Sequence, residues 1–322
     1  MSERYVQPLR TLIQLIFLVL CIWIGVQFAY YIAAINSGTP PTVARPGGIE
    51  AFLPISGLFG TAAWLKGGSI NPVHPAAVVI FVSIIVVSLA LRRAFCSWIC
   101  PVGTISEWLW KLGFKKLGRN FRPPRWLDYA LRGIKYLLLA YFLFAAATWS
   151  LDSLNGFLYS GYHAISDQKL LNLFLRPSAT TLTVLALLLF LSVALRNPFC
   201  RYLCPYGALL GLSALLSPSA VQRDTNRCVS CGVCSQVCPS RIDVMHARRV
   251  NDTECLGCWR CISHCRVHSA LRMRLFGRFV IQGVVFALLV VGIFWGGTLL
   301  GKATGHWQSI VTPDDYRQLL QR

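Results

Sequence analysis

Five long apolar stretches limit what this chain can fold into. An α-helix of about 20 residues, rising 1.5 Å per residue, crosses roughly 30 Å of hydrocarbon. The chain is 55% hydrophobic and only 13% charged, whereas a soluble domain carries about 25% charged residues. The sequence therefore predicts a mainly α, polytopic membrane bundle of about five transmembrane helices. The predicted spans run over about Thr11–Ile35, Pro75–Leu91, Tyr129–Trp149, Thr180–Leu195 and Phe276–Leu300.

Lys and Arg residues are unevenly divided between the predicted loops. The N-terminus, residues 92–135 and residues 196–278 carry 24 of the 31, and seven lie on the opposite side. Cytoplasmic loops of membrane proteins carry such an excess. This predicts a bacterial inner-membrane protein with a cytoplasmic N-terminus and a periplasmic C-terminus. No aromatic-studded basic module accompanies the net charge of +19, so the charge indicates topology and not nucleic-acid binding.

A short internal repeat ends two of the predicted spans. Residues 90–103 read ALRRAFCSWICPVG and residues 194–207 read ALRNPFCRYLCPYG. Eight of the fourteen positions are identical, including both cysteines, the proline and the final glycine. Related half-units of this kind often form a shared site where they meet.

Eight of the thirteen cysteines form two runs with one spacing. The first run is Cys-x2-Cys-x2-Cys-x3-Cys-Pro from Cys228 to Pro239, and the second ends at Cys265. This run is typical of bacterial two-cluster ferredoxins, in which the fourth cysteine ligates the other cluster. The sequence thus predicts two [4Fe–4S] clusters in an inserted ferredoxin-like α+β segment. The ligands of cluster 1 would be Cys228, Cys231, Cys234 and Cys265, and those of cluster 2 would be Cys255, Cys258, Cys261 and Cys238.

Zinc and disulfides are the alternatives for these cysteines. Zinc prefers paired CxxC knuckles, and a third cysteine in the same phase does not fit that pattern. Disulfides are rare in the cytoplasm. The second run ends with Arg266 where the first has proline, but proline does not ligate iron, so both clusters are still expected.

The repeat supplies four more cysteines, in two Cys-x3-Cys-Pro pairs. On a helix, a spacing of four places both sulfur atoms on one face, and the proline would break the helix or occupy the first turn of the next. The four thiols could hold a metal ion or an additional iron–sulfur centre, or could form a redox-active set. Buried structural cysteine is the alternative. The four residues are Cys96, Cys100, Cys200 and Cys204.

Three polar residues near the outer span ends have two interpretations each. His74 and His163 could help to bind a quinone, haem or copper, or could simply be hydrogen-bonded. Glu50 could take a proton from a quinol, or could pair with Arg45.

Two CxxxCP pairs followed by a two-cluster segment resemble the NapH/NosR group of membrane polyferredoxins. The resemblance covers about Arg45–Arg278, including the RPGGIEAFLP and NPVHP stretches. It implies an electron-transfer subunit of a quinol-linked oxidoreductase. NosR-like relatives carry an outer flavin-binding domain and CcoG-type relatives a C-terminal outer domain. The short ends of this chain favour the compact NapH-like core.

The leading functional hypothesis is an electron relay between quinone and a partner redox protein, either a periplasmic reductase or a cytoplasmic donor. The alternatives are a copper or iron reductase or assembly factor that uses the CxxxCP cysteines, and a redox-sensing regulator. No nucleophile–base pair or nucleotide-binding loop indicates self-contained substrate chemistry. The predicted domains are a membrane domain (1–218), a ferredoxin segment (219–274) and a last span with a short tail (275–322).

Overall fold

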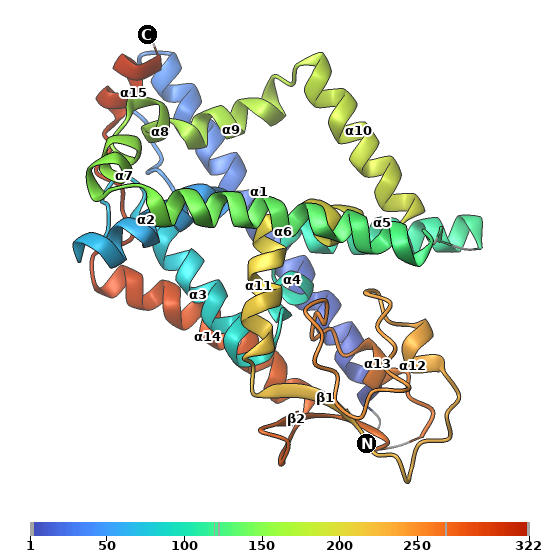
Figure 1. Ribbon diagram of the computed structural model, residues 1–322. Coiled ribbons are helices and arrows are strands. Elements are labelled where there is room, and N and C mark those ends of the chain that lie inside the picture. The colour runs from blue at the N-terminus through green and yellow to red at the C-terminus, as the bar shows by residue number, and fades with distance from the viewer. Residues whose placement is uncertain (1–2, 119, 122, 268, 321–322) are drawn as a thin grey trace. The chain divides into compact units, whose positions relative to one another are not determined.

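The structure of the protein is a computed structural model and is mainly helical (Figure 1). The residues described are 3–118, 120–121, 123–267 and 269–320. Its residues form two compact units. All cysteines except Cys21 belong to unit 1, so the candidate sites lie there. Unit 1 comprises Met1–Leu18, Ile85–Leu139 and Ala186–Ile293, and unit 2 comprises Val19–Ile84, Ala140–Leu185 and Phe294–Arg322.

Several helices could span a membrane. In the part of the chain that the structure describes, three are long and apolar enough: α1 (Val6–Asn36), α6 (Arg125–Thr148) and α14 (Gly283–Ala303). Helices α9 (Ser166–Leu175) and α10 (Ala179–Ala194) qualify together, with a bend of 76° between them. Helix α3 (Pro75–Leu91) has 17 residues, which at about 1.5 Å each falls short of roughly 30 Å. The count of five spans stays a prediction.

The predicted fifth span starts too early. Phe276 and Gly277 have φ angles of 50° and 75° and form a turn between β2 (Leu271–Leu275) and β3 (Phe279–Ile281). The aromatic and β-branched residues of β3 suit a strand and pair with β2, so α14 begins only at Gly283. Mean hydropathy does not separate an apolar strand from the first turns of an apolar helix.

The cysteine-rich segment is flanked in the chain by the strands of a three-stranded antiparallel sheet in the order β1-β2-β3 (Figure 1). β1 (Ser219–Arg223) pairs with β2 so that Val221 lies opposite Met273, and Met273 lies opposite Ile281 on β3. These three side chains are buried. The short helices α12 (Val233–Gln236) and α13 (Arg260–Ser263) lie between β1 and β2 in the chain and each carry one cysteine of a run.

Proline positions the helices that follow the cysteine pairs. Pro101 and Pro205 occupy the first turn of α5 (Pro101–Leu117) and α11 (Pro205–Leu215), where a missing backbone N–H costs nothing. The sequence prediction of this position is confirmed. The preceding turns are α4 (Ala94–Trp98) and η3 (Phe199–Leu203), the latter a single π-helical turn.

Unit 2 has two apolar clusters of its own. Phe28, Tyr31 and Tyr316 belong to the first, and Phe59 and Leu154 belong to the second. The remaining elements of the chain are η1 (Glu3–Tyr5), η2 (Gly47–Phe52), α2 (Pro54–Gly67), α7 (Leu151–Leu158), α8 (Gly161–Ala164) and α15 (Pro313–Leu320).

Candidate iron–sulfur site

The two cysteine runs share one backbone conformation. Ser230 and Gly257, each just before the second cysteine of its run, have φ angles of 52° and 57°. Gly232 and Trp259, each just after that cysteine, have φ angles of 73° and 62° and cap α12 and α13. Positive φ turns backbone N–H groups toward the inside of a loop. The same local fold therefore occurs twice, although the second run uses tryptophan where the first uses glycine.

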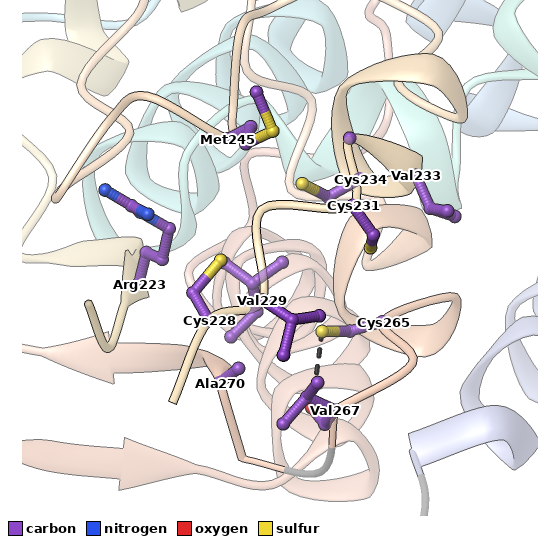
Figure 2. Close-up of a pocket in the computed structure, with 12 residues that line it drawn as sticks. Arg223, Cys228, Val229, Cys231, Val233, Cys234, Met245, Cys265, Val267 and Ala270 are labelled. Carbon is purple, nitrogen blue, oxygen red and sulfur yellow. Dashed lines mark hydrogen bonds between the residues drawn. The ribbon is translucent and has the colours of Figure 1, made fainter. Parts of the chain in front are cut away.

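Four of the cysteines line one hollow in unit 1, which we call the outer hollow. Figure 2 shows Cys228, Cys231, Cys234 and Cys265 around it, together with Arg223 and Met245. Its volume is ≈ 360 Å³, including space open to solvent. Three of the four come from the first run and the fourth from the end of the second. This set is the one that the sequence predicts for cluster 1.

The other four cysteines of the runs line a second hollow, which we call the inner hollow. It has a volume of ≈ 390 Å³ by the same measure and is also lined by Val221 and Trp259. Here Cys238, from the first run, lies with the second run. The lining cysteines are Cys238, Cys255, Cys258 and Cys261.

The donor sets fit a multi-atom group better than a single ion. Each hollow is lined by four thiols, three from one cysteine run and one from the other. Within the described ranges, no three His, Cys, Asp or Glu side chains are gathered closely enough to hold one metal ion. Four thiols spaced around a hollow are the donor set of a [4Fe–4S] cubane.

The two hollows differ in exposure. Cys231 at the outer hollow is exposed, whereas Cys238 and Cys255 at the inner hollow are buried. A hydrogen bond from the Ser230 backbone, together with Arg223, lowers the pKa of Cys228. Burial instead raises the pKa of Cys238 to about 12. Cys231 is therefore a thiol of the outer hollow that lies at the molecular surface.

Side chains from helices of unit 1 donate hydrogen bonds to the backbone of residues 256–258, a loop that lines the inner hollow. Ser97 Oγ donates to the Leu256 carbonyl at 2.7 Å, and Trp98 Nε1 donates to the Gly257 carbonyl at 3.1 Å. Gln7 Nε2 of α1 donates to the Cys258 carbonyl at 3.0 Å. The first CxxxCP motif thus packs directly on the second cysteine run, because Ser97 and Trp98 lie inside that motif.

The CxxxCP cysteines do not share one helical face. Cys96 and Cys200 lie in α4 and η3, but Cys100 and Cys204 cap α5 and α11 in an extended conformation. Proline restricts the residue before it to this conformation, so the helix predicted for each pair is interrupted at its second cysteine. The Cys204 sulfur accepts a hydrogen bond from the Gly207 amide at 3.2 Å.

The four CxxxCP thiols nevertheless interact electrostatically in unit 1. Burial and then the charge of Cys96 raise the pKa of Cys100 to about 12. Burial and then Cys100 also raise the pKa of Cys200. For Cys204, burial raises the pKa most, and Cys96 contributes. These couplings place the two pairs near each other, as the internal repeat suggests.

The Arg93 side chain interacts electrostatically with three of these thiols. Burial alone would lower the pKa of its guanidinium, but the charges of Cys96, Glu254, Cys200 and Cys204 raise it. Its side chain is 1% exposed, and a Cβ atom on Gly207 would lie 2.9 Å from its Nη2. A buried cation beside Cys96, Cys200 and Cys204 favours the deprotonated, ligating form of these thiols.

Arg93 also connects this site to the inner hollow. Its Nη1 donates to Glu254 Oε2 and to the Thr253 carbonyl, both at 3.1 Å, and Lys135 Nζ pairs with Glu254 Oε1. Glu254 directly precedes Cys255. Two buried cations thus share one buried carboxylate. The sequence did not predict this group of charges, although the first repeat has Arg93 at the position where the second has Asn197.

Glu50, His74 and His163 belong to a hydrogen-bonded network in unit 2. Arg45 pairs with Glu50 and with Asp167, each at 2.8 Å, so the ion-pair interpretation of Glu50 is the one observed. His74 Nε2 lies 2.9 Å from the His163 carbonyl, and its Nδ1 lies 3.2 Å from Glu50. Burial lowers the pKa of His163 to about 4. Both histidines therefore have hydrogen-bond partners within the chain.

Sequence comparisons agree with the chemistry of these donors. The profile of a family described as "4Fe-4S dicluster domain" matches residues 220–266. The profile of a second family, described as "4Fe-4S binding domain", matches residues 73–120 and 178–222. This second profile therefore matches the two CxxxCP regions and not the two cysteine runs of Cys228–Cys265. No solved structure matches the chain.

Relatives cover most of the chain. It is 41% identical over 318 residues to the "Putative electron transport protein YccM" of Escherichia coli, covering 97% of this chain and 89% of that protein. It is 28% identical over 207 residues to the "Ferredoxin-type protein NapH" of Escherichia coli, covering 59% of this chain and 66% of that protein. It is 28% identical over 184 residues to the "Regulatory protein NosR" of Pseudomonas aeruginosa, covering 53% of this chain and 23% of that protein. The chain therefore belongs to the NapH/NosR-type family of ferredoxin-type, 4Fe–4S-binding membrane proteins that transport electrons.

Proposed function

We propose that this protein relays electrons between the membrane quinone pool and a partner redox protein. The observation that carries the proposal is the arrangement of eight cysteines around two hollows, with Cys231 exposed at the outer hollow and Cys238 and Cys255 buried at the inner one. Bound [4Fe–4S] clusters would supply one-electron transfer. Several apolar helices, α1, α6 and α14 among them, would supply the contact with a membrane quinone.

In this proposal there are two ferredoxin-type clusters with crossed ligands. Cys228, Cys231, Cys234 and Cys265 hold cluster 1, and Cys238, Cys255, Cys258 and Cys261 hold cluster 2. The lining of the outer and inner hollows supports this division. The exposed Cys231 makes the outer hollow the place of exchange with a soluble partner, since electron transfer needs close approach.

The CxxxCP cysteines would hold a third, anionic centre. Arg93 and Lys135 bring two positive charges to a buried region where Glu254 supplies one negative charge. Burying an uncompensated charge costs several kcal/mol, and a thiolate-held cluster would supply the missing negative charge. The match of a 4Fe-4S family profile to both CxxxCP regions supports the same assignment. Cys96, Cys100, Cys200 and Cys204 would then extend the relay from the inner hollow.

The proposed topology places the N-terminus and residues 219–274 in the cytoplasm of a bacterium and the C-terminus in the periplasm. The excess of Lys and Arg in the N-terminus and in residues 92–135 and 196–278 supports it. The partner would be a periplasmic reductase or a cytoplasmic electron donor, and the chain would act as a subunit of a quinol-linked oxidoreductase.

Quinol oxidation provides the test of this function. Purified protein in lipid nanodiscs, mixed anaerobically with a quinol analogue, is expected to lose the broad visible absorbance of oxidised clusters. The variants Cys96→Ser and Cys204→Ser are expected to slow this reduction if the CxxxCP centre lies on the route. Cys21→Ser is the matched control, because Cys21 is the one cysteine outside the repeats and runs.

Metal handling is the second candidate, because four thiols of unit 1 interact at the CxxxCP pairs. It predicts stoichiometric copper binding that the same two variants abolish. Failure of every quinol to reduce the clusters, together with such copper binding, would replace the quinol proposal by this one. Reduction by quinol at an unchanged rate in both variants would exclude a role for the CxxxCP cysteines in either process.

A further inference from the structure

An exposed apolar patch lies at the edge of the sheet in unit 1. Phe276 and Phe279 flank the turn between β2 and β3 and are 68% and 67% exposed. The Phe276 amide donates to the Pro218 carbonyl at 3.0 Å, which brings the segment containing Leu216, 79% exposed, beside the turn. We call these three side chains the hairpin patch. Contiguous exposed apolar groups of this kind mark interaction sites.

The hairpin patch lies close in sequence to a candidate membrane span. Phe279 precedes Gly283, the first residue of α14, by four positions, a reach of at most about 13 Å in an extended chain. The polar layer on each side of a bilayer is roughly 5–8 Å thick, given a core of about 30 Å within about 40–45 Å. Exposed apolar residues continue into α14 at Val284, 41%, and Leu288, 68%. The patch must therefore lie in or next to the interfacial layer.

The charge around the patch is positive. Arg274 and Arg278 lie on either side of the turn, and Arg274 Nη1 donates to the Gly277 carbonyl at 3.4 Å. The sequence contains no Asp or Glu between Glu254 and Asp314. Arginine near the membrane surface is attracted to anionic lipid by about 1 kcal/mol per residue. The hairpin patch thus combines apolar groups with a charge complementary to lipid phosphate.

We propose that the hairpin patch binds the anionic bilayer surface. Phe276, Phe279 and Leu216 enter the boundary between headgroups and acyl chains, and Arg274 and Arg278 contact lipid phosphates. This contact fixes the sheet at the membrane surface, and the sheet carries β1, which lines both hollows through Val221 and Arg223. Binding of the hairpin patch to lipid would be the same whichever direction electrons take through the protein.

Photo-crosslinking in nanodiscs tests the proposal. The photoreactive analogue p-benzoylphenylalanine is placed at Phe276, at Phe279 or, as a control, at His246, whose side chain is 71% exposed. Burial of a phenylalanine in an apolar layer contributes about 1.5–3 kcal/mol, so lipid adducts at the two hairpin positions should exceed those at His246 by about tenfold or more. Iron content equal to that of the unchanged protein shows that the variants fold.

The dependence of the adducts on the lipid headgroup tests whether the hairpin patch binds anionic lipid. Lipid adducts at the hairpin positions should increase when phosphatidylglycerol replaces phosphatidylcholine. Arg278→Gln should reduce that increase about fivefold, because about 1 kcal/mol of attraction between the arginine and anionic lipid is lost. Arg227→Gln, at an exposed arginine paired with Asp224, should leave it unchanged. Equal lipid adducts at all three positions, adducts to another polypeptide, or no dependence on phosphatidylglycerol would each overturn the proposal.

Discussion

Replacing Cys238 by serine is expected to remove the cluster that Cys255, Cys258 and Cys261 otherwise hold, although Cys238 belongs to the other run. The reason is its place in the lining of the inner hollow, where the buried Cys238 lies together with those three residues. With two ferredoxin-type clusters of equal iron content, this variant should lose the iron of one whole cluster. Iron analysis and low-temperature EPR of the reduced protein measure the loss.

The opposite variant provides the control. Cys265→Ser should remove the cluster of the outer hollow and leave the inner one, so the two variants should lose different EPR signals. Loss of the same signal in Cys238→Ser and Cys228→Ser would contradict the crossed assignment, because it would mean that each run holds its own cluster.

Replacing Glu254 by glutamine is expected to destabilise the protein by about 3–5 kcal/mol, the range for breaking a buried ion pair from one side. Glu254 is 4% exposed and is the carboxylate shared by Arg93 and Lys135. Its loss leaves Arg93 and Lys135 without the carboxylate that they share. Thermal unfolding in detergent, followed by cluster absorbance and by tryptophan fluorescence, measures the effect.

Asp243→Asn is the matched control, because the Asp243 side chain pairs with His246 but is 62% exposed. Exposed pairs contribute about 0–1 kcal/mol. Adding Lys135→Met to Glu254→Gln should recover part of the loss, since one unpaired cation is then removed. An effect of Glu254→Gln no larger than that of Asp243→Asn would show that Arg93 and Lys135 do not depend on this carboxylate.

The cysteine runs were readable from the sequence because their spacing specifies a loop. Three thiols at fixed intervals, with a fourth just beyond a short helix, leave few ways to surround a cluster, and the cysteines of each predicted set line one hollow. The ligand assignment itself stays a proposal that the Cys238 and Cys265 variants test.

Other features depended on contacts that the sequence does not display. The start of α14 was placed seven residues early because Phe279 and Val280 are as apolar as the helix, and only their pairing with β2 identifies a strand. The CxxxCP pairs were expected on one helix, but Pro101 and Pro205 force the cysteines before them into an extended conformation. Glu254 was missed because its partners are 161 and 119 residues away in the chain.

The contacts around the two hollows also imply an order of maturation. The residues that line the two hollows all lie between Val221 and Leu271, so the hollows are distinguished by the contacts that reach them from outside this segment. The loop of the inner hollow is held by Gln7, Ser97 and Trp98 from distant helices. We therefore expect iron loading to be staged, with the inner hollow filled only after the helices of unit 1 have assembled. A newly made chain would then gain its complete redox route last, after insertion into the membrane.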